Sequence, residues 1–159
     1  MIKRLLLTFL ISTTLSGCGF ALRGNIALPD TLKTVAVLGD DADLVNQLED
    51  TLRRSDVTVT TADNENAVQI DLGEVRYQRS VNSTDSNGRA TSYNLNYKVE
   101  YNVIAANGTA LQTDQRISQT RLLDYNPEQE LQSQEEEEFL QQEMREEIVL
   151  QLIRRLTRL

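Results

Sequence analysis

The stretch Tyr93-Asn94-Leu95-Asn96-Tyr97-Lys98-Val99-Glu100-Tyr101-Asn102-Val103 decides the fold. Its odd positions are all apolar or aromatic, and its even positions are all polar or charged. Because successive side chains of a strand point to opposite faces, this alternation predicts a sheet with one face on a core and one polar face. The apolar face has to pack against other elements of the chain to be buried.

Turn signals on both sides of this strand predict an antiparallel meander. Asn87-Gly88 and Asn107-Gly108 are dipeptides typical of tight hairpins, because both residue types tolerate positive φ. The polar residues 82–86 are expected to form a loop before the first turn. The neighbouring strands are then expected over Ala67–Ser80 and Thr109–Arg121.

The strand expected over Ala67–Ser80 changes phase in its middle. Its apolar side chains occupy even positions up to Leu72 and odd positions from Val75 onward. A one-residue phase change is what a β-bulge produces, and glycine is common at bulges. The sequence therefore predicts a bulge or sharp bend at Gly73–Glu74.

A strand and a helix precede the meander. The apolar run Leu32–Leu38 predicts the strand, and Ala42–Arg54 predicts a helix whose leucines share one face. Asp40 or Asp41 is expected to cap this helix, a use that fits better than a metal site because no calcium-loop spacing follows. Residues 57–60 start the return to the sheet, through what we expect to be a right-handed crossover.

The last element is a long helix that starts at Asn126-Pro127, a favourable cap and first helical residue, and that could run to the end of the chain. Its apolar residues recur at helical spacing and most simply pack on the sheet, with a partner-binding face as the alternative. They are Leu140, Met144, Ile148, Val149, Leu152, Ile153, Leu156 and Leu159.

These elements predict an α+β fold, a two-layer sandwich. Two helices pack on one face of a mostly antiparallel, four-stranded mixed sheet in the order β-α-β-β-β-α. The other face of the sheet is left polar, with Asn94, Asn96 and Asn102 on its central strand. This face is either plain solvated surface or a surface that sits in the polar lumen of another protein.

The N-terminus has the anatomy of a secretory signal. Lys3 and Arg4 precede a short apolar core, which is too short to span a membrane. The following Leu15-Ser16-Gly17-Cys18 resembles a bacterial lipobox, whose cysteine is lipidated and becomes the first residue. The alternative is an ordinary signal peptide that merely contains a cysteine. We expect residues 1–17 to be a lipoprotein signal peptide, 18–30 a lipidated tether, and 31–159 a single domain.

Lipidation of Cys18 would anchor the protein. An S-diacylglycerol and an N-acyl chain together hold a protein firmly in a bilayer, because each buried CH₂ contributes about 0.8 kcal/mol. Gly19 follows the cysteine, where an aspartate would mark retention in the inner membrane. The expected location is therefore the outer membrane of a Gram-negative cell, with the domain facing the periplasm.

Composition excludes several classes of function. The chain carries 16 basic and 24 acidic residues, and cleavage of the signal would take the net charge from −8 to −10, which argues against a nucleic-acid partner. Histidine is absent, Cys18 is the only cysteine, and Lys33 and Lys98 are the only lysines after the signal. We therefore expect no metal, no cofactor besides the covalent lipid, no disulfide and no catalytic residues.

Several motifs, taken in order, resemble the LPS-assembly lipoprotein LptE family. Cys18-Gly19-Phe20-Ala21-Leu22-Arg23-Gly24 is similar to the family's Cys-Gly-aromatic-x-Leu-Arg start. The segments at 72–75, 87–88, 124–127 and 151–156 are also similar. The resemblance implies a plug inside the outer-membrane barrel LptD that helps the barrel assemble and assists delivery of lipopolysaccharide to the cell surface.

The resemblance also implies basic residues that contact lipopolysaccharide phosphates. The start of the last helix is acidic here, so Arg79 and Arg89 near the first hairpin are the residues expected to supply any such contact. The alternative is that both are ordinary solubilising arginines. Two other functions stay open: a lipoprotein of similar fold that serves another envelope partner, and an anchored hydrolase.

Overall fold

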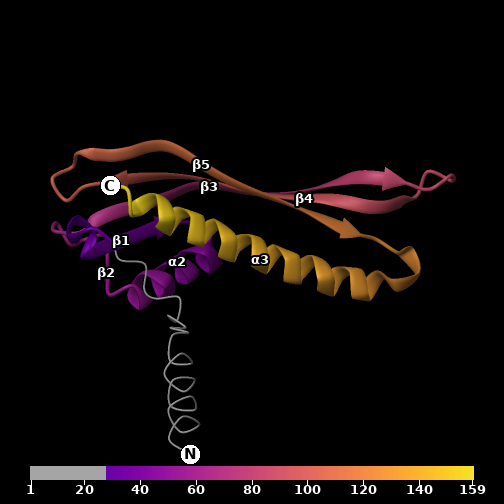
Figure 1. Cartoon of the computed structure of the whole chain (residues 1–159), viewed down its shortest axis with the longest axis horizontal. Coiled ribbons are helices and arrows are strands. Elements are labelled where there is room, and N and C mark those ends of the chain that lie inside the picture. Colours follow the sequence, from indigo (N-terminus) through magenta and orange to yellow (C-terminus); the bar gives the residue numbers. More distant parts are fainter. Residues whose placement is uncertain (1–27) are drawn as a thin grey trace, which may run out of the picture.

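The computed structural model describes residues 28–159, shown in colour in Figure 1. The expected signal peptide over 1–17, the expected lipidation site at Cys18 and most of the expected tether lie outside the described residues. The described chain starts at Leu28, which is partly buried against the hydrophobic core.

A mixed sheet and two helices form two layers, and both helices lie on the same side of the sheet (Figure 1). The strands are β1 (Thr34–Gly39), β2 (Thr58–Thr60), β3 (Val68–Thr84), β4 (Ala90–Ile104) and β5 (Ala110–Asp124), and the helices are α2 (Ala42–Arg54) and α3 (Glu130–Leu156). The strand order is β2-β1-β3-β4-β5. The α+β architecture with two helices is therefore confirmed.

The prediction of four strands is wrong, because the sheet has five. β2 pairs in parallel with the outer edge of β1, from Thr34 opposite Thr58 to Ala36 opposite Thr60. β3 then pairs in parallel with the other side of β1. β2 has only three residues, two of them threonines, so its period-2 pattern is too short to mark a separate strand.

The alternation in β4 gives the sheet one buried face and one polar face, as predicted. Leu95, Tyr97, Val99, Tyr101 and Val103 are each at most 1% exposed, whereas the even-numbered side chains between them are half-buried on the opposite face. Both predicted hairpins are also confirmed. Gly88 and Gly108 adopt φ of 78° and 80°, which a side chain would strain.

The bulge in β3 lies where the phase change predicted it. The pairing of β3 with β4 shifts register between Leu72 and Val75, so that Gly73 and Glu74 have no partner in the ladder. The loop predicted over residues 82–86 is wrong in its first part, because β3 continues to Thr84. Polar cross-strand contacts such as Ser83 Oγ to Thr91 Oγ1 (2.7 Å) sustain the pairing there, and the hairpin projects beyond the helices (Figure 1).

Asp41 begins α2 and also joins this helix to the sheet. Its Oδ1 accepts a hydrogen bond from the backbone N–H of Leu44 (2.9 Å), which confirms the predicted cap. Its Oδ2 accepts a hydrogen bond from the phenol of Tyr97 (3.0 Å), whose ring is buried under β4. The start of α2 is therefore fixed relative to the central strand.

The apolar stripe of α3 covers the sheet. Met144, Ile148, Leu152 and Leu156 are all at most 1% exposed. A short 3-10 turn, Pro127–Gln129, precedes α3. Asn126 Oδ1 accepts a hydrogen bond from the backbone N–H of Glu128 (3.0 Å), so Asn126 is a cap as expected. The expected burial of Leu159 is wrong: α3 ends at Leu156, and Leu159 is 40% exposed.

The close approach of β1 to β3 gives a test of the packing. A Cβ added at Gly39 would lie 2.9 Å from Leu72 Cβ and 3.2 Å from Val45 Cγ2, whereas one added at Gly73 would lie no closer than 3.6 Å to Glu100 O. Gly39→Ala should therefore lower the free energy of unfolding by about 1–3 kcal/mol, the usual cost of overpacking. Gly73→Ala is the matched control and should change it by less than about 0.5 kcal/mol in the same urea titration. Equal effects would contradict the register of β1 on β3.

Candidate functional site

The open face of the sheet is the face of β3, β4 and β5 that points away from α2 and α3. It carries the even-numbered side chains of β4 and their cross-strand neighbours. Its amide and hydroxyl groups bond to one another across strands. Asn94 Nδ2 donates to Asn82 Oδ1 (3.1 Å), and Asn96 Nδ2 donates to Thr120 Oγ1 (3.0 Å).

Several charges on the open face pair with each other. Glu100 on β4 accepts hydrogen bonds from Arg116 on β5 at 2.6 and 2.9 Å, and Lys98 Nζ lies 3.5 Å from the same carboxylate. The hydrogen bonds from Arg116 hold the pKa of Glu100 below its ordinary value. On β3, Arg76 forms an ion pair with Glu74. Asp71, the neighbour of Asn102 on β3, has no ion pair within residues 28–159, so several of the charges on this surface are paired, but not all.

Arg79 lies on the helix side of the sheet, in a cluster of aromatic and acidic side chains. Its Nη1 is 2.6 Å from Glu137 Oε2, and its guanidinium lies 3.7 Å from the centre of the Tyr93 ring. The phenol of Tyr77 donates a hydrogen bond to Glu137 Oε1 (2.7 Å). We call Arg79, Glu137 and Tyr77 the hairpin clamp, because they tie the β3–β4 hairpin to the first half of α3.

Arg89 lies in the turn of the same hairpin, apart from Arg79. Its Nε is 2.9 Å from Asp85 Oδ2, and its side chain is 67% exposed. Asp85 also accepts hydrogen bonds from the backbone N–H groups of Asn87 and Arg89. The backbone hydrogen bond from Arg89 is the main reason that the pKa of Asp85 is lowered. Five residues of strand, roughly 17 Å at 3.4 Å per residue, separate Arg79 from this turn. The structure therefore does not bring the two predicted site residues together.

Glu137 is the residue of the clamp that sequence analysis missed. Its run of four glutamates is typical of a solvated helix face. The helical spacing could have shown that Glu137 faces the sheet. Glu137 lies seven residues, about two turns, before the buried Met144 and so belongs to the same stripe. Ser133, one turn earlier, is also buried.

Residues 28–159 hold no group of three acidic side chains that could bind a metal ion. No helix of the described part is long and apolar enough to cross a membrane. Every buried polar side-chain atom in this range has a hydrogen-bond partner. The open face, the hairpin clamp and the hairpin turn are candidate sites within the described residues.

The hairpin clamp gives a pH test. Burial raises the pKa of the Tyr77 phenol, and its hydrogen bond to Glu137 raises that pKa further. The pKa of a tyrosine in the unfolded chain is about 10. The stabilisation that comes from keeping the Tyr77 phenol neutral is therefore present below pH 10 and is lost as the pH rises above it. Glu137→Gln should lower the pKa of Tyr77 only in part, since burial remains. The titration is followed by tyrosinate absorbance, with Glu138→Gln as the control. An unchanged Tyr77 pKa in Glu137→Gln would contradict the clamp.

Comparison with known proteins was made for the whole chain. The family described as "LptE: Lipopolysaccharide-assembly" matches residues 32–156. The chain is similar to the LPS-assembly lipoprotein LptE of Photorhabdus laumondii, with 29% identity over 89% of this chain and 78% of the relative. It is also similar to that of Pectobacterium atrosepticum, with 27% identity over 89% of this chain and 77% of the relative.

Solved structures have the same fold. The solution structure of lipoprotein B from Nitrosomonas europaea matches with a TM-score of 0.73 and 26% identity, over 87% of this chain and 90% of that chain. The rare lipoprotein B of Shewanella oneidensis matches with a TM-score of 0.64 and 24% identity, over 79% and 91%, and shows the fold alone. Because the family match spans both helices and all five strands, the chain belongs to the LptE family of lipopolysaccharide-assembly lipoproteins.

Proposed function

We propose that this lipoprotein is a plug inside the outer-membrane barrel LptD, and that it helps the barrel assemble and assists delivery of lipopolysaccharide to the cell surface. Membership of the LptE family supports the role in lipopolysaccharide assembly. The observation that carries the finer proposal is the polar open face of β3, β4 and β5, where amides and several charges pair with one another.

The chemistry of the open face suits the inside of a large barrel. Lumens of outer-membrane barrels are polar, because lipid-facing and lumen-facing side chains alternate along each strand. An apolar face would be favoured only against an apolar partner. Unpaired charges would have to lose water on contact. The open face also carries Leu122, which is 54% exposed opposite Asn94. Its amides, hydroxyls and paired charges can instead exchange hydrogen bonds with a polar wall and with trapped water.

A lipid on Cys18 would hold the domain close to the barrel. Residues 18–27 span at most about 33 Å when fully extended, at 3.3 Å per residue. The domain would therefore stay near the periplasmic surface of the outer membrane, while two or three acyl chains keep it there. In this proposal the anchor raises the local concentration of the plug around the barrel.

Purification of the native complex tests the proposal. The chain should co-purify with the barrel in a stoichiometric complex from detergent-solubilised outer membranes. Depletion of the chain should lower the amount of lipopolysaccharide at the cell surface, measured by surface labelling. A lipoprotein that serves another envelope partner, or a hydrolase, would show neither result, and a chain recovered free of the barrel would contradict the proposal.

In the same proposal, Arg79 and Arg89 supply the contacts with lipid phosphates. Arg89 is the more accessible, because its side chain is 67% exposed and only Asp85 pairs with its guanidinium. Arg79 would have to exchange Glu137 for a phosphate.

The contribution of Arg89 can be measured on the isolated domain. Arg89→Glu should weaken lipopolysaccharide binding about tenfold, since a charge-assisted hydrogen bond contributes about 1.5–3 kcal/mol. Arg53→Glu is the matched control, because Arg53 is similarly exposed and pairs with Glu49 and Asp50 on α2. If surface plasmon resonance gives the same affinity for both variants, Arg89 does not contact the lipid.

A further inference from the structure

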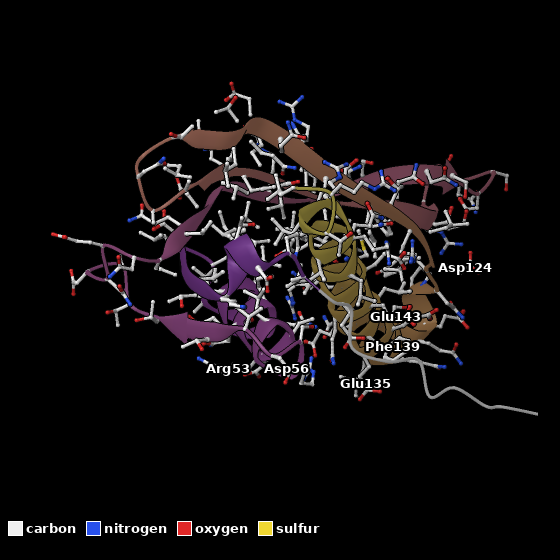
Figure 2. The ribbon with its side chains drawn as sticks, turned by 60° about the vertical axis from the view of Figure 1, so that its left-hand side comes forward. Arg53, Asp56, Asp124, Glu135, Phe139 and Glu143 are labelled. Carbon is white, nitrogen blue, oxygen red and sulfur yellow. The ribbon has the colours of Figure 1, made fainter. Side chains whose placement is uncertain are left out.

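One side of α3 carries exposed apolar side chains. We call it the outer ridge, because its members follow one another at intervals of three or four residues and so lie along one side of the helix. The members are Leu131, Glu135, Phe139, Glu143, Glu146 and Leu150. Leu131 is 71% exposed, Phe139 60% and Leu150 42%. Figure 2 shows Glu135, Phe139 and Glu143 together on this side of α3, away from the sheet.

The described chain leaves the first half of the outer ridge uncovered. A groove of about 840 Å³ between α2 and α3 is lined on α3 by residues from Gln142 to Leu150. Leu131, Glu135 and Phe139 lie before this groove and outside the hydrophobic core. Leu131 and Phe139 are large apolar side chains exposed on the same side of α3, about two turns apart.

The charge of the outer ridge differs from that of the open face. Residues 130–143 contain six glutamates and no lysine or arginine. Glu137 pairs with Arg79, but Glu135 and Glu143 have no ion pair or hydrogen bond within residues 28–159. On the open face, by contrast, Glu74 and Glu100 each have a basic partner. The outer ridge therefore combines apolar side chains with uncompensated negative charge.

We infer that the outer ridge docks a basic segment of the barrel partner, one that places an apolar side chain against Phe139 and cationic side chains against Glu135 and Glu143. The inference rests on the proposed function and adds a second contact surface to it. An anionic lipid surface or lipopolysaccharide would be repelled by these glutamates. A second copy of the chain would meet the same negative charge, so a cationic protein segment is the complementary occupant.

The test uses the full-length lipoprotein in cells, co-purified with the barrel. Glu135→Lys/Glu143→Lys reverses the charge on both sides of Phe139. Asp63→Lys/Glu65→Lys is the matched control, because it makes the same charge change in the exposed loop before β3. The outer-ridge variant should recover about tenfold less barrel than the control, as charge reversal at an interface commonly does. Equal recovery by both variants would overturn the inference and leave the proposed function standing. Failure of the unaltered chain to recover any barrel would overturn both.

A second measurement does not depend on destabilising the complex. Photo-cross-linking from benzoylphenylalanine at position 139 should give an adduct with the barrel. An adduct with a second copy of the chain, or no adduct while the complex stays intact, would overturn the inference.

The double variant Glu135→Gln/Glu143→Gln should make recovery of the complex less sensitive to added salt, since it removes the charges that salt screens. Unchanged salt sensitivity would count against the inference.

Discussion

The packing of the apolar stripe of α3 on the core-facing sides of β4 and β5 is the contact on which the rest of the structure depends. Tyr97, Val99 and Tyr101 on β4 and Met144, Ile148 and Leu152 on the helix are all at most 1% exposed. Because strand side chains alternate between faces, this burial fixes which side chains remain on the open face. It also fixes the rotation of α3, and so directs Phe139 and its neighbouring glutamates outward.

The two surfaces left outside the core differ in how their charges are satisfied. The open face pairs several of its charges and bonds its own amides, as the contacts of Glu100 and Asn96 show. The glutamates of the outer ridge have no ion pair within residues 28–159. In our account the open face is suited to a polar wall, and the outer ridge is suited to a cationic segment. The hairpin clamp holds the two surfaces in a fixed relation, because Glu137 on α3 joins Arg79 and Tyr77 on β3.

Features that depend on neighbouring residues could be predicted from the sequence, and those that depend on distant contacts could not. The alternation in β4, the bulge after Leu72 and the cap at Asp41 each follow from a few adjacent residues, and all are confirmed. Residues 57–60 were predicted as the start of a strand but not as a separate one, because the three residues of β2 carry too little pattern. The clamp was missed because Glu137 and Arg79 lie 58 residues apart, and the glutamate run around Glu137 suggested solvent. The lipidation of Cys18 stays a prediction.

The central claim is that the open face of the sheet lies against the barrel in the native outer membrane. Thiol labelling of Ser118→Cys tests it most directly, because Ser118 lies on the exposed part of that face opposite Lys98, and Cys18, the only native cysteine, is expected to carry the lipid. A membrane-impermeant maleimide should modify the purified domain rapidly and the membrane-embedded complex slowly. Equal labelling rates in the purified domain and in the complex with the barrel would contradict the account.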